Sequence, residues 1–567
     1  MIDPHALWTR PAPWLAMAVL GLPVVAGLAG VIAPAFGWLP ALGGTSPTLA
    51  HWQALGQTPG LVDMVRLSAV TGLASAGLSL TIVVLFLGAF LRTRLFGVVR
   101  RLLSPLLAVP HAAAAIGLAF LFAPSGLAPR LVSPWASGWQ YPPDYLFPGD
   151  PGGLALILGL TIKEVPFLLL MSLAALPQCR ADARLDVARG LGYRPMAAFL
   201  KAVLPGLYPL LRLPIYAVIV FATATVDVAL ILGPTTPPPL SVAVLRWLND
   251  PDLAMRFMAS AGALLQLGVT LAALLAWWGL ERLTVRLCRN WLSDGRRAFA
   301  DTALRWLGLG LLGSTLALVM GSLAGLVLWS LAGYWPFPAA LPWPWIADNW
   351  HSAFDGLATP LGHAAGIGLA ATLISLVLVL GALETESRRT RPVGRWSEWL
   401  LYLPLLVPPV AFLFGLVLVQ TQLGLAPGIT AVIAAHVVFV LPYVFLSLAE
   451  SHRRLDPRWT QLARSLGASP SRVFWRVRLP LLTAPLLTAA AVGFAVSIGQ
   501  YLPTLLLGAG RVATVTTEAV SLASGGDRRL TAVHALLQLL LPAVGFALAL
   551  GLPRLLFRHR TGLVSPS

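Results

Sequence analysis

Charged side chains are scarce in this sequence. Asp, Glu, Lys and Arg together make up 11% of the 567 residues, whereas 57% are hydrophobic, and the mean hydropathy is +0.80. A chain of this length would ordinarily form several soluble domains, but such domains are about one quarter charged. The low charge content therefore excludes a set of soluble domains and indicates a polytopic membrane protein.

Cysteine and lysine are rarer still, with two residues of each. Cys179 and Cys288 both fall in segments that we assign to the cytoplasm, where thiols stay reduced, so no disulfide is expected. Neither Lys163 nor Lys201 belongs to the phosphate-binding pattern G-x-x-x-x-G-K-[ST]. A GxSxG turn, an HExxH helix and clustered Cys and His residues are also missing. We therefore expect no catalytic residue, no metal site, no cofactor bound by this chain and no ATP hydrolysis by the chain itself.

The net charge is nevertheless +17 at pH 7. The basic residues are spread over short segments between apolar runs and are not gathered on one domain, so they do not indicate a nucleic-acid-binding surface. Membrane proteins carry such an excess of Lys and Arg in their cytoplasmic loops. The charge pattern predicts contact with a lipid bilayer, and no nucleic acid is expected as a partner.

Twelve apolar runs are long enough to cross a bilayer, for which a helix needs about 20 residues. They lie near residues 14–36, 67–91, 105–123, 153–177, 207–233 and 257–280 in the first half, and near 307–333, 361–383, 399–420, 429–449, 481–508 and 530–553 in the second. The first run follows Arg10 and could be read as a signal peptide. Because it has the length of a full span, we interpret it as a retained anchor.

The basic residues of alternate loops predict the orientation. With the N-terminus inside, 30 of the 39 Lys and Arg residues fall on the cytoplasmic side and seven on the opposite side, while Lys163 and Arg212 lie within spans. Because cytoplasmic loops are the basic ones, both chain ends are predicted to be cytoplasmic. The arginine-rich segment 281–306 is interpreted as a cytoplasmic connection between two halves.

One stretch of the second half has a close relative in the first. Residues 186–205 read DVARGLGYRPMAAFLKAVLP, and residues 461–480, which lie 275 positions later, read QLARSLGASPSRVFWRVRLP. Eight of the twenty aligned positions are identical, including the internal glycine and both prolines. This similarity indicates an internal duplication.

The residues of the second stretch predict a short helix, a turn and another short helix. Gly467 suits the left-handed residue that ends the first helix, Ser469 can cap the next one, and Pro470 suits its first position. Pro480 predicts a break before the following apolar run. The many arginines place the stretch outside the hydrocarbon region of the membrane.

Both stretches resemble the cytoplasmic "EAA" loop of ABC-importer permeases, with the pattern E-A-A, three residues, G, nine residues and I-x-L-P. The matching residues are Asp186, Ala188, Gly192 and Pro205 in the first stretch, and Gln461, Ala463, Gly467 and Pro480 in the second. This chain departs from the pattern at its glutamate, which is replaced by Asp186 and Gln461. In that family the loop is a coupling helix seated in a groove of a separate ATPase subunit, which implies that these eight residues couple to an ATPase.

The resemblance implies an all-α polytopic membrane fold with about twelve transmembrane helices in two six-helix type I ABC permease (MetI-like) repeats. The first module is expected at 1–290, a cytoplasmic linker at 291–306 and the second module at 307–567. Among such proteins the chain looks most like fused permeases of the iron(III) and thiamine type. Its solute would then be a small charged nutrient such as thiamine or ferric iron.

The same resemblance implies the location and the partners. The chain would be a multi-pass protein of the bacterial inner (plasma) membrane that forms the translocation pathway. It would work with two copies of a cytoplasmic ABC ATPase, which bind ATP-Mg, and with a periplasmic or lipid-anchored solute-binding protein.

Charged residues inside the spans are candidates for the pathway, because charge is costly in hydrocarbon. Lys163 and Glu164 are adjacent in the fourth run, and Asp227 lies in the fifth. At about 1.5 Å per residue, Lys163 and Asp227 lie about 15 Å and 9 Å below the predicted outer surface. We therefore hypothesise that Lys163 pairs with Asp227. The pair could line the solute path or could only fasten two helices together.

A second set of pathway candidates lies in the eleventh run, at Ser497, Gln500, Tyr501 and Thr504. Their spacing of i, i+3, i+4 and i+7 would place them on one helical face. The alternative is that they pack helices together, as small polar residues often do in membranes. His111, His436 and His534 lack metal-ligand spacing, and we expect them to be helix contacts.

A different class of transporter also fits part of this pattern. A twelve-helix secondary transporter driven by an ion gradient is likewise built from repeats with buried charges. In that reading Lys163, Glu164 and Asp227 would be coupling sites for the ion, and no ATPase partner would be needed.

Overall fold

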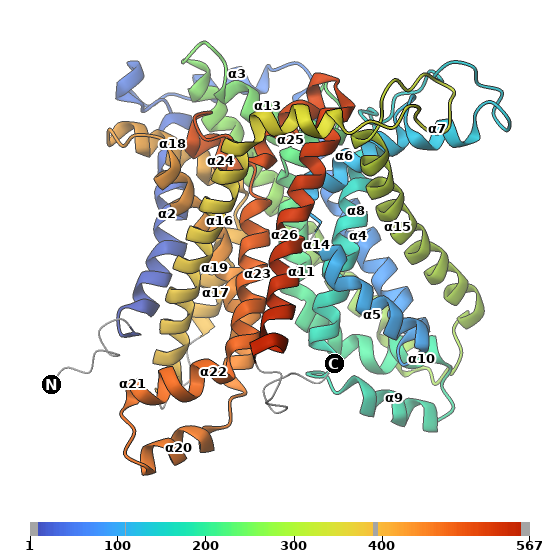
Figure 1. The fold of residues 1–567 in the computed structure, drawn as a ribbon, viewed down its shortest axis with the longest axis vertical. Coiled ribbons are helices and arrows are strands. Elements are labelled where there is room, and N and C mark those ends of the chain that lie inside the picture. The colour runs from blue at the N-terminus through green and yellow to red at the C-terminus, as the bar shows by residue number, and fades with distance from the viewer. Residues whose placement is uncertain (1–8, 108, 389–394, 557–567) are drawn as a thin grey trace. The chain divides into compact units, whose positions relative to one another are not determined.

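The structure is a computed structural model that describes residues 9–107, 109–388 and 395–556. The chain is 77% helical, and the described residues contain no strand (Figure 1). The two chain ends that the charge count assigns to the cytoplasm include residues 1–8 and 557–567, which lie outside the described residues. The same holds for residues 389–394 of the predicted loop between the eighth and ninth spans.

Most helices follow one another after short connections, and residues 133–153 and 331–347 form longer irregular connections. In the first half they are α2 (Ala12–Ala35), η1 (Pro40–Leu42), α3 (Ala50–Gly56), α4 (Leu61–Phe90), α5 (Arg94–Leu107), α6 (His111–Phe122), α7 (Leu127–Val132), α8 (Leu154–Ala175), α9 (Ala181–Gly190), α10 (Pro195–Ala198), η2 (Phe199–Val203), α11 (Leu204–Ala224), α12 (Asp227–Leu232), α13 (Leu240–Leu248) and α14 (Met255–Ser293). In the second half they are α15 (Asp301–Ser330), α16 (Asp348–Ser387), α17 (Arg395–Leu406), α18 (Pro409–Gln422), α19 (Ile429–Arg453), α20 (Pro457–Ser465), α21 (Pro470–Val473), η3 (Phe474–Arg478), α22 (Leu479–Leu481), α23 (Thr483–Ile498), α24 (Leu502–Gly508), α25 (Val515–Gly525) and α26 (Arg528–Leu556).

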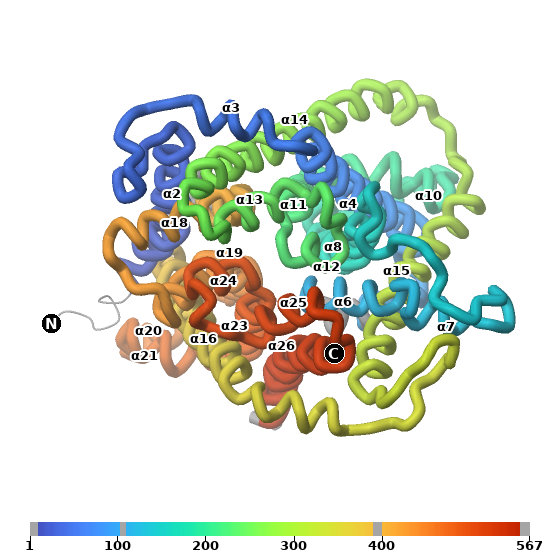
Figure 2. The backbone as a smooth tube through the Cα atoms, turned by 90° about the horizontal axis from the view of Figure 1, so that it is seen from above, coloured from blue at the N-terminus to red at the C-terminus, as the bar shows by residue number. Residues whose placement is uncertain are grey.

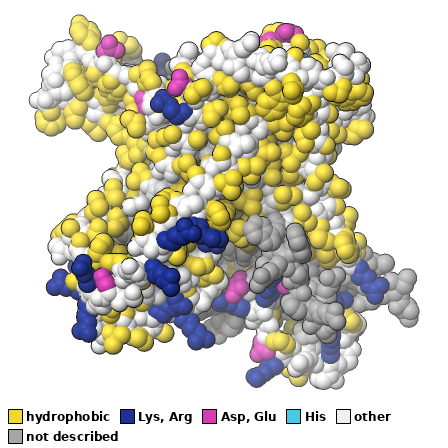
Figure 3. Space-filling model, turned by 180° about the vertical axis from the view of Figure 1, so that it is seen from behind, with side chains coloured by type: hydrophobic (Ala, Val, Ile, Leu, Met, Phe, Trp, Pro, Cys, Tyr) yellow, Lys and Arg dark blue, Asp and Glu magenta, His cyan; other side chains and the backbone are white. Residues whose placement is uncertain are grey.

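Ten helices of the described chain are long and apolar enough to cross a membrane, and two bent helix pairs raise the number to as many as twelve. The pairs are Leu400–Leu406 with Pro409–Gln422, bent by 97°, and Pro470–Leu481 with Thr483–Ile498, bent by 72°. On the face drawn in Figure 3, hydrophobic side chains cover most of the surface, and Lys and Arg gather toward its lower part. The predicted all-α polytopic membrane fold is confirmed.

Proline interrupts the apolar run of the third span in each half. The run near 105–123 contains the end of α5 and then a new helix, α6, which begins at His111 directly after Pro110. In the second half α17 ends at Leu406, and α18 begins at Pro409 after Pro408. Proline lacks an N–H and clashes with the preceding turn, so each apolar run bends or restarts where the sequence alone shows a continuous span.

The contacts divide the chain into two compact units. One comprises Val31–Ser352 and Val520–Ala535, and the other comprises Met1–Gly30, Ala353–Ala519 and Leu536–Ser567. The unit that contains Ala353–Ala519 therefore includes most of α2, the first helix of the chain. The unit that contains Val31–Ser352 includes α15, the first helix of the second half. These units follow packing, whereas the modules 1–290 and 307–567 follow sequence similarity and stay a prediction.

Glycine permits the close packing of both of these helices. A Cβ atom at Gly27 of α2 would lie 2.1 Å from the carbonyl oxygen of Phe412 in α18, and one at Gly117 of α6 would lie 2.9 Å from Ser322 of α15. Small residues let membrane helices approach at backbone distance, where van der Waals contact holds them together. The first helix of each half therefore packs closely against a helix from the third span of the other half, α2 against α18 and α15 against α6.

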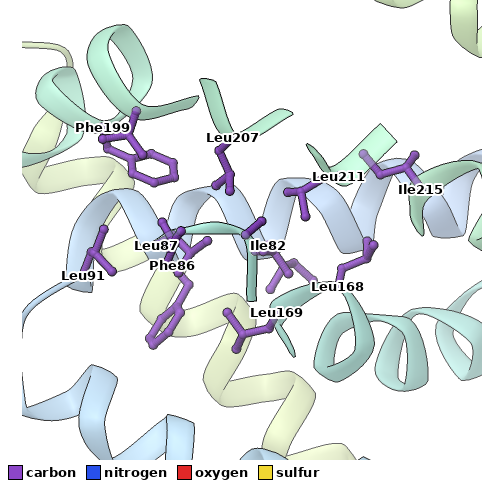
Figure 4. Close-up of a cluster of buried hydrophobic side chains, with 14 of the residues drawn as sticks. Ile82, Phe86, Leu87, Leu91, Leu168, Leu169, Phe199, Leu207, Leu211 and Ile215 are labelled. Atoms are coloured by element: carbon purple, nitrogen blue, oxygen red, sulfur yellow. The ribbon is translucent and has the colours of Figure 1, made fainter. Parts of the chain in front are cut away.

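A large hydrophobic cluster forms the core of the Val31–Ser352 unit (Figure 4). It joins Phe86 and Leu87 of α4, Leu168 of α8, Leu211 of α11 and Phe199 of η2. In Figure 2 the helices α4, α8, α11 and α12 of this unit lie side by side, as their contacts also show. Because Phe199 belongs to the first EAA-like stretch, this stretch is rooted in the core.

Candidate functional site: two coupling segments and the polar groups of the spans

The second EAA-like stretch forms the predicted helix, turn and helix. Helix α20 ends at Ser465, and Gly467 follows with a φ of +80°, a left-handed conformation that glycine adopts without strain. The Ser469 hydroxyl accepts a hydrogen bond from the Arg472 N–H at 3.3 Å, and Pro470 starts the next helix. The turn predicted from Gly467, Ser469 and Pro470 is therefore confirmed.

The first stretch has the same backbone course. Helix α9 ends at Gly190, Gly192 has a φ of +82°, and Pro195 begins α10. We call these two regions, 181–205 and 457–480, the coupling segments after the family loop that they resemble. In Figure 1 α9 and α10 lie at the opposite end of their own unit from α13, and α20 and α21 lie at the opposite end of theirs from α24.

Both coupling segments contain a π-helical turn, which the sequence did not reveal. It spans Phe199–Val203 in the first segment and Phe474–Arg478 in the second, again 275 positions apart. The π-turn is rare and recurs at functional sites. After it, Pro205 lies in the first turn of α11, and the chain continues as helix. In the second segment the helix ends at Leu481, which confirms the break predicted at Pro480.

An arginine holds the first coupling segment from outside. Arg92, which follows α4, donates hydrogen bonds to Asp182 Oδ1 at 2.7 Å and to Asp186 Oδ1 at 2.5 Å. The Arg92 guanidinium holds the pKa of Asp186 below its usual value. Ala188, on the same helix, is buried, while Gly192 and Pro205 are exposed. Asp186 therefore already has a partner, although its side chain is still 65% exposed.

The second coupling segment is held differently, because α20 buries none of its side chains. Gln461 and Gly467 are exposed, and Ala463 is half-buried. The apolar side chains of Trp459, Leu462 and Leu466 are also exposed, Leu466 by 80%. The contact with its own unit comes later, at the π-turn, where Phe474 is buried. This leaves an apolar helix face open to a partner.

A buried charged cluster fastens that π-turn. Arg478 Nη1 lies 3.0 Å from Glu384 Oε1 and donates to Ser387 Oγ at 3.1 Å, and His452 Nε2 lies 3.3 Å from the same Glu384 oxygen. Glu384 lies in the last turn of α16 and His452 in the last turn of α19, so the cluster ties the segment to two spans. This cluster was not predicted from the sequence. The two glutamates of the stretch ALETES, which directly follows an apolar run, were the sequence feature that could have indicated it.

Two charged residues of the fourth and fifth spans, Glu164 and Asp227, have identified partners. Glu164 Oε1 lies 3.4 Å from His111 Nε2, and the Asp227 carboxylate accepts a hydrogen bond from Thr225 Oγ1 at 3.0 Å. Lys163 is buried, and α12, which begins at Asp227, packs against α8. The structure thus brings both elements of the hypothesised pair into contact, and the Lys163–Asp227 ion pair itself stays a prediction.

The polar stripe of the eleventh run is interrupted. Helix α23 ends at Ile498 and α24 begins at Leu502, so Gln500 and Tyr501 lie in a break and the expectation of one continuous helical face is wrong. Ser497 and Thr504 are buried and are joined by His436 of α19, whose Nδ1 and Nε2 lie 2.7 Å and 2.9 Å from the two hydroxyl oxygens. His436 is therefore the helix contact that was expected.

The fifth span of the first half breaks in the same register. Helix α11 ends at Ala224 and α12 begins at Asp227, 275 positions before Leu502. A helix end leaves carbonyl groups without a partner, and in a membrane they must find one inside the protein. Gln266 Nε2 donates to the Thr223 carbonyl at 3.1 Å, and Ser241 Oγ donates to the Thr225 carbonyl at 2.8 Å.

Matching groups close the break of the second half. Thr516, which is 275 positions after Ser241, donates its hydroxyl to the Ile498 carbonyl, and Gln538 Nε2 donates to Thr516 Oγ1 at 3.0 Å. Both short helices that bring these hydroxyls, α13 and α25, also begin 275 positions apart. The two breaks are built features, and the sequence alone shows only uninterrupted apolar runs there.

Comparisons with known proteins agree with this arrangement. Residues 378–558 match the family model of the binding-protein-dependent transport system inner membrane component. The chain is 33% identical over 540 residues to the inner membrane ABC transporter permease protein YnjC of Escherichia coli (strain K12), covering 94% of each protein.

Shorter relatives match part of the chain. The molybdenum transport system permease protein ModB of Mycobacterium tuberculosis (strain ATCC 25618 / H37Rv) is 32% identical over 190 residues, which are 30% of this chain and 72% of ModB. The putative 2-aminoethylphosphonate transport system permease protein PhnV of Salmonella typhimurium is 27% identical over 206 residues, 36% of this chain and 75% of PhnV. The extent of the match to YnjC shows that the chain belongs to the family of binding-protein-dependent transport system inner membrane components, the permeases of ABC transporters.

Proposed function

We propose that this chain supplies both permease modules of an ABC importer, one at 1–290 and one at 307–567, joined by a cytoplasmic linker at 291–306. The observation that carries the proposal is the recurrence of local structure at one offset. The left-handed glycines of the coupling segments, the π-turns, the second parts of the broken fifth spans and the short helices that follow all recur 275 positions apart. Duplication and fusion of one six-helix module would produce such a pattern.

Each coupling segment would contact one copy of a cytoplasmic ABC ATPase that binds ATP-Mg. The contact residues would be Asp186, Ala188, Gly192 and Pro205 on one side and Gln461, Ala463, Gly467 and Pro480 on the other. The exposed apolar side chains of α20 support this role, since α20 buries nothing within its own unit. Members of this family work with an ATPase and a binding protein in general, and two segments favour two ATPase copies.

The solute would pass through the spans, from a periplasmic or lipid-anchored binding protein to the cytoplasm of a bacterial cell. Lys163, Glu164 and Asp227, with Ser497, Gln500, Tyr501 and Thr504, are the proposed polar residues near this path. The names of the relatives range from molybdenum to 2-aminoethylphosphonate systems, so the family as a whole does not fix the solute. The resemblance to iron(III) and thiamine permeases favours a small charged nutrient such as thiamine or ferric iron.

The orientation rests on charge. The coupling segments carry most of the basic residues of their loops, and cytoplasmic loops are the basic ones. The chain would lie in the inner membrane with both ends in the cytoplasm. The rival hypothesis of an ion-gradient-driven carrier gains no support from YnjC, ModB and PhnV, which are named as permease proteins of transport systems.

Replacing Gly467 with arginine tests the ATPase contact. Its Cβ position has no atom within 4 Å, so the new side chain would project from the segment toward any docked partner. Gly510 is the matched control, because it has a φ of +72° and equally open surroundings in the same unit. We expect G467R to lose most of its co-purification with the ATPase and its ATP-driven uptake in proteoliposomes, while G510R keeps both.

Two results would overturn the proposal. One is equal ATPase association of G467R and G510R. The other is uptake by proteoliposomes that contain this chain alone and are energised by a proton gradient, because that is the behaviour of a secondary transporter.

A further inference from the structure

Two arginines of the Val31–Ser352 and Val520–Ala535 unit share one backbone carbonyl. Arg130 Nε and Arg528 Nη1 both donate to the Ser125 oxygen, at 3.0 Å and 3.1 Å. Arg130 is only 3% exposed, and its remaining hydrogen bonds reach the carbonyls of Trp335, Pro336 and Ala339. Two guanidinium groups are thus held close together by neutral acceptors.

Aromatic rings also lie against both guanidinium groups. The Trp329 ring centroid lies 5.9 Å from Arg130 Cζ and 5.2 Å from Arg528 Cζ, and Phe120 lies 5.7 Å from Arg528 Cζ. A ring face attracts a cation but carries no net charge. Burial of like charges without a carboxylate is costly, and an anion would lower that cost.

Arg528 also faces a cavity of about 390 Å³. Phe120 of α6, Tyr145 and Phe147 of the loop between α7 and α8, and Thr531 of α26 contribute to its wall. Among the sixteen described residues that line it, Arg528 is the one charged side chain. The volume lies in the range of small-molecule sites, which are mostly apolar with a few polar groups that fix the ligand.

A neighbouring cavity of about 520 Å³ shares Arg528 but has a different character. Asp527, Arg528 and Arg529 all line it, so it presents a carboxylate beside the two guanidinium groups. The Asp527 carboxylate accepts hydrogen bonds from the Arg529 and Leu530 N–H groups. This cavity is less suited to an anion than the first, whose wall holds no acid.

We propose that the first cavity binds a small organic anion, a carboxylate or phosphonate with a short apolar end. The Arg528 guanidinium pairs with the anionic oxygens, since its planar N–H groups match such oxygens in pairs. Phe120 and Phe147 contact the apolar end, and Arg130 positions the Ser125 carbonyl that holds Arg528. The proposal rests on the proposed function, because the charge-based orientation places this cavity at the outer end of the spans, where solute would enter. It names an anion as the solute class and so differs from the cations thiamine and ferric iron that the resemblance favours.

Binding of methylphosphonate to the purified full-length protein tests the proposal. We expect a saturable rise in melting temperature with methylphosphonate, measured against chloride at equal ionic strength, and no rise with methylammonium. R528A and R528Q should abolish the rise in melting temperature. R528K should need at least ten times more methylphosphonate for half of the rise. R529A is the matched control, because it removes the same charge one position away and Arg529 does not line the cavity. Melting without the probe shows whether the Arg528 variants are folded.

Two outcomes would overturn the site. One is an equal rise in R528A and R529A, and the other is no rise in the wild-type protein. If the wild-type protein shows no rise but still associates with the ATPase, the cavity proposal fails alone. If ATPase association fails, the proposed function fails independently of the anion.

Discussion

At the scale of single residues, an ion pair links each coupling segment to the second span of its half, but the acidic and basic partners are exchanged between the two. In the first, Arg92 at the end of α4 holds Asp182 and Asp186 of the segment. In the second, Glu384 at the end of α16 holds Arg478 of the segment. The sign of the charge differs, but the link between the second span and the coupling segment is present in both.

Removing the Glu384 carboxylate should be costly because Glu384 and His452 are buried and the Arg478 side chain is only 14% exposed. E384Q would leave Arg478 and His452 without their carboxylate, and breaking a buried ion pair on one side destabilises a protein by about 3–5 kcal/mol. Glu450 is the matched control, since it pairs with Arg454 at 2.7 Å on the surface, with side chains 62% and 72% exposed. E450Q should cost no more than about 1 kcal/mol.

Thermal unfolding in detergent measures both variants. A clear fall in melting temperature for E384Q, with little change for E450Q, is the expected result. Equal melting of the two variants would show that the buried cluster does not stabilise the second segment. E384L/R478M removes both charges together, and it should recover most of the melting temperature that E384Q loses.

At the scale of elements, the broken fifth spans depend on hydroxyl and amide groups from distant parts of the chain. Ser241 is buried and donates to the Thr225 carbonyl, so S241A would leave that carbonyl without its donor. An unsatisfied buried polar group costs about 1–3 kcal/mol. Ser524 is the control, because its exposed hydroxyl bonds only within its own helix, to the Ser521 carbonyl.

Hydrogen exchange checks this prediction. We expect faster exchange of the amides in α12 and α13 for S241A, and no change there for S524A. Unchanged exchange in S241A would mean that another donor replaces the serine hydroxyl and that Ser241 does not stabilise the break.

Sequence patterns predicted most of the spans and the turn of the second coupling segment, because both depend on local properties. A span is a run of apolar residues, and the turn of the second segment follows from Gly467, Ser469 and Pro470 in order. The fifth-span breaks are different, since the groups that make them tolerable lie at positions such as Ser241 and Gln538, far along the chain. The buried cluster of Glu384, likewise, joins three elements that no local pattern connects.

At the scale of the whole molecule, the first helix of each half packs in the unit formed mainly by the other half. The apolar runs do not predict that α2 and α15 pack with the other half, because both helices have the composition of ordinary spans. The small residues at their contacts are the visible trace, and glycine is too frequent in membrane helices to have identified them beforehand.

Two glycines of α2 should respond oppositely to alanine. A Cβ at Gly27 would collide with the Phe412 backbone, whereas one at Gly21 would lie 3.5 Å from Leu400 Cδ1, an ordinary contact. G27A should therefore loosen α2 and lower the melting temperature. G21A should be neutral or should stabilise the protein by up to about 1 kcal/mol, because alanine favours helix. Limited proteolysis near the N-terminal helix would report the same difference, and equal digestion of both variants would argue against the tight α2–α18 contact.

The glycine-lined face of α2 has a consequence for how the protein is made. Gly27 leaves the ribosome early, but Phe412 follows 385 positions later. At about 5–20 residues per second, the nascent helix waits roughly 20–80 s for its neighbour to be translated. During that interval lipid or the insertion machinery must cover the face of α2 that later packs on α18. Assembly of the unit that contains Ala353–Ala519 is therefore completed only late in synthesis.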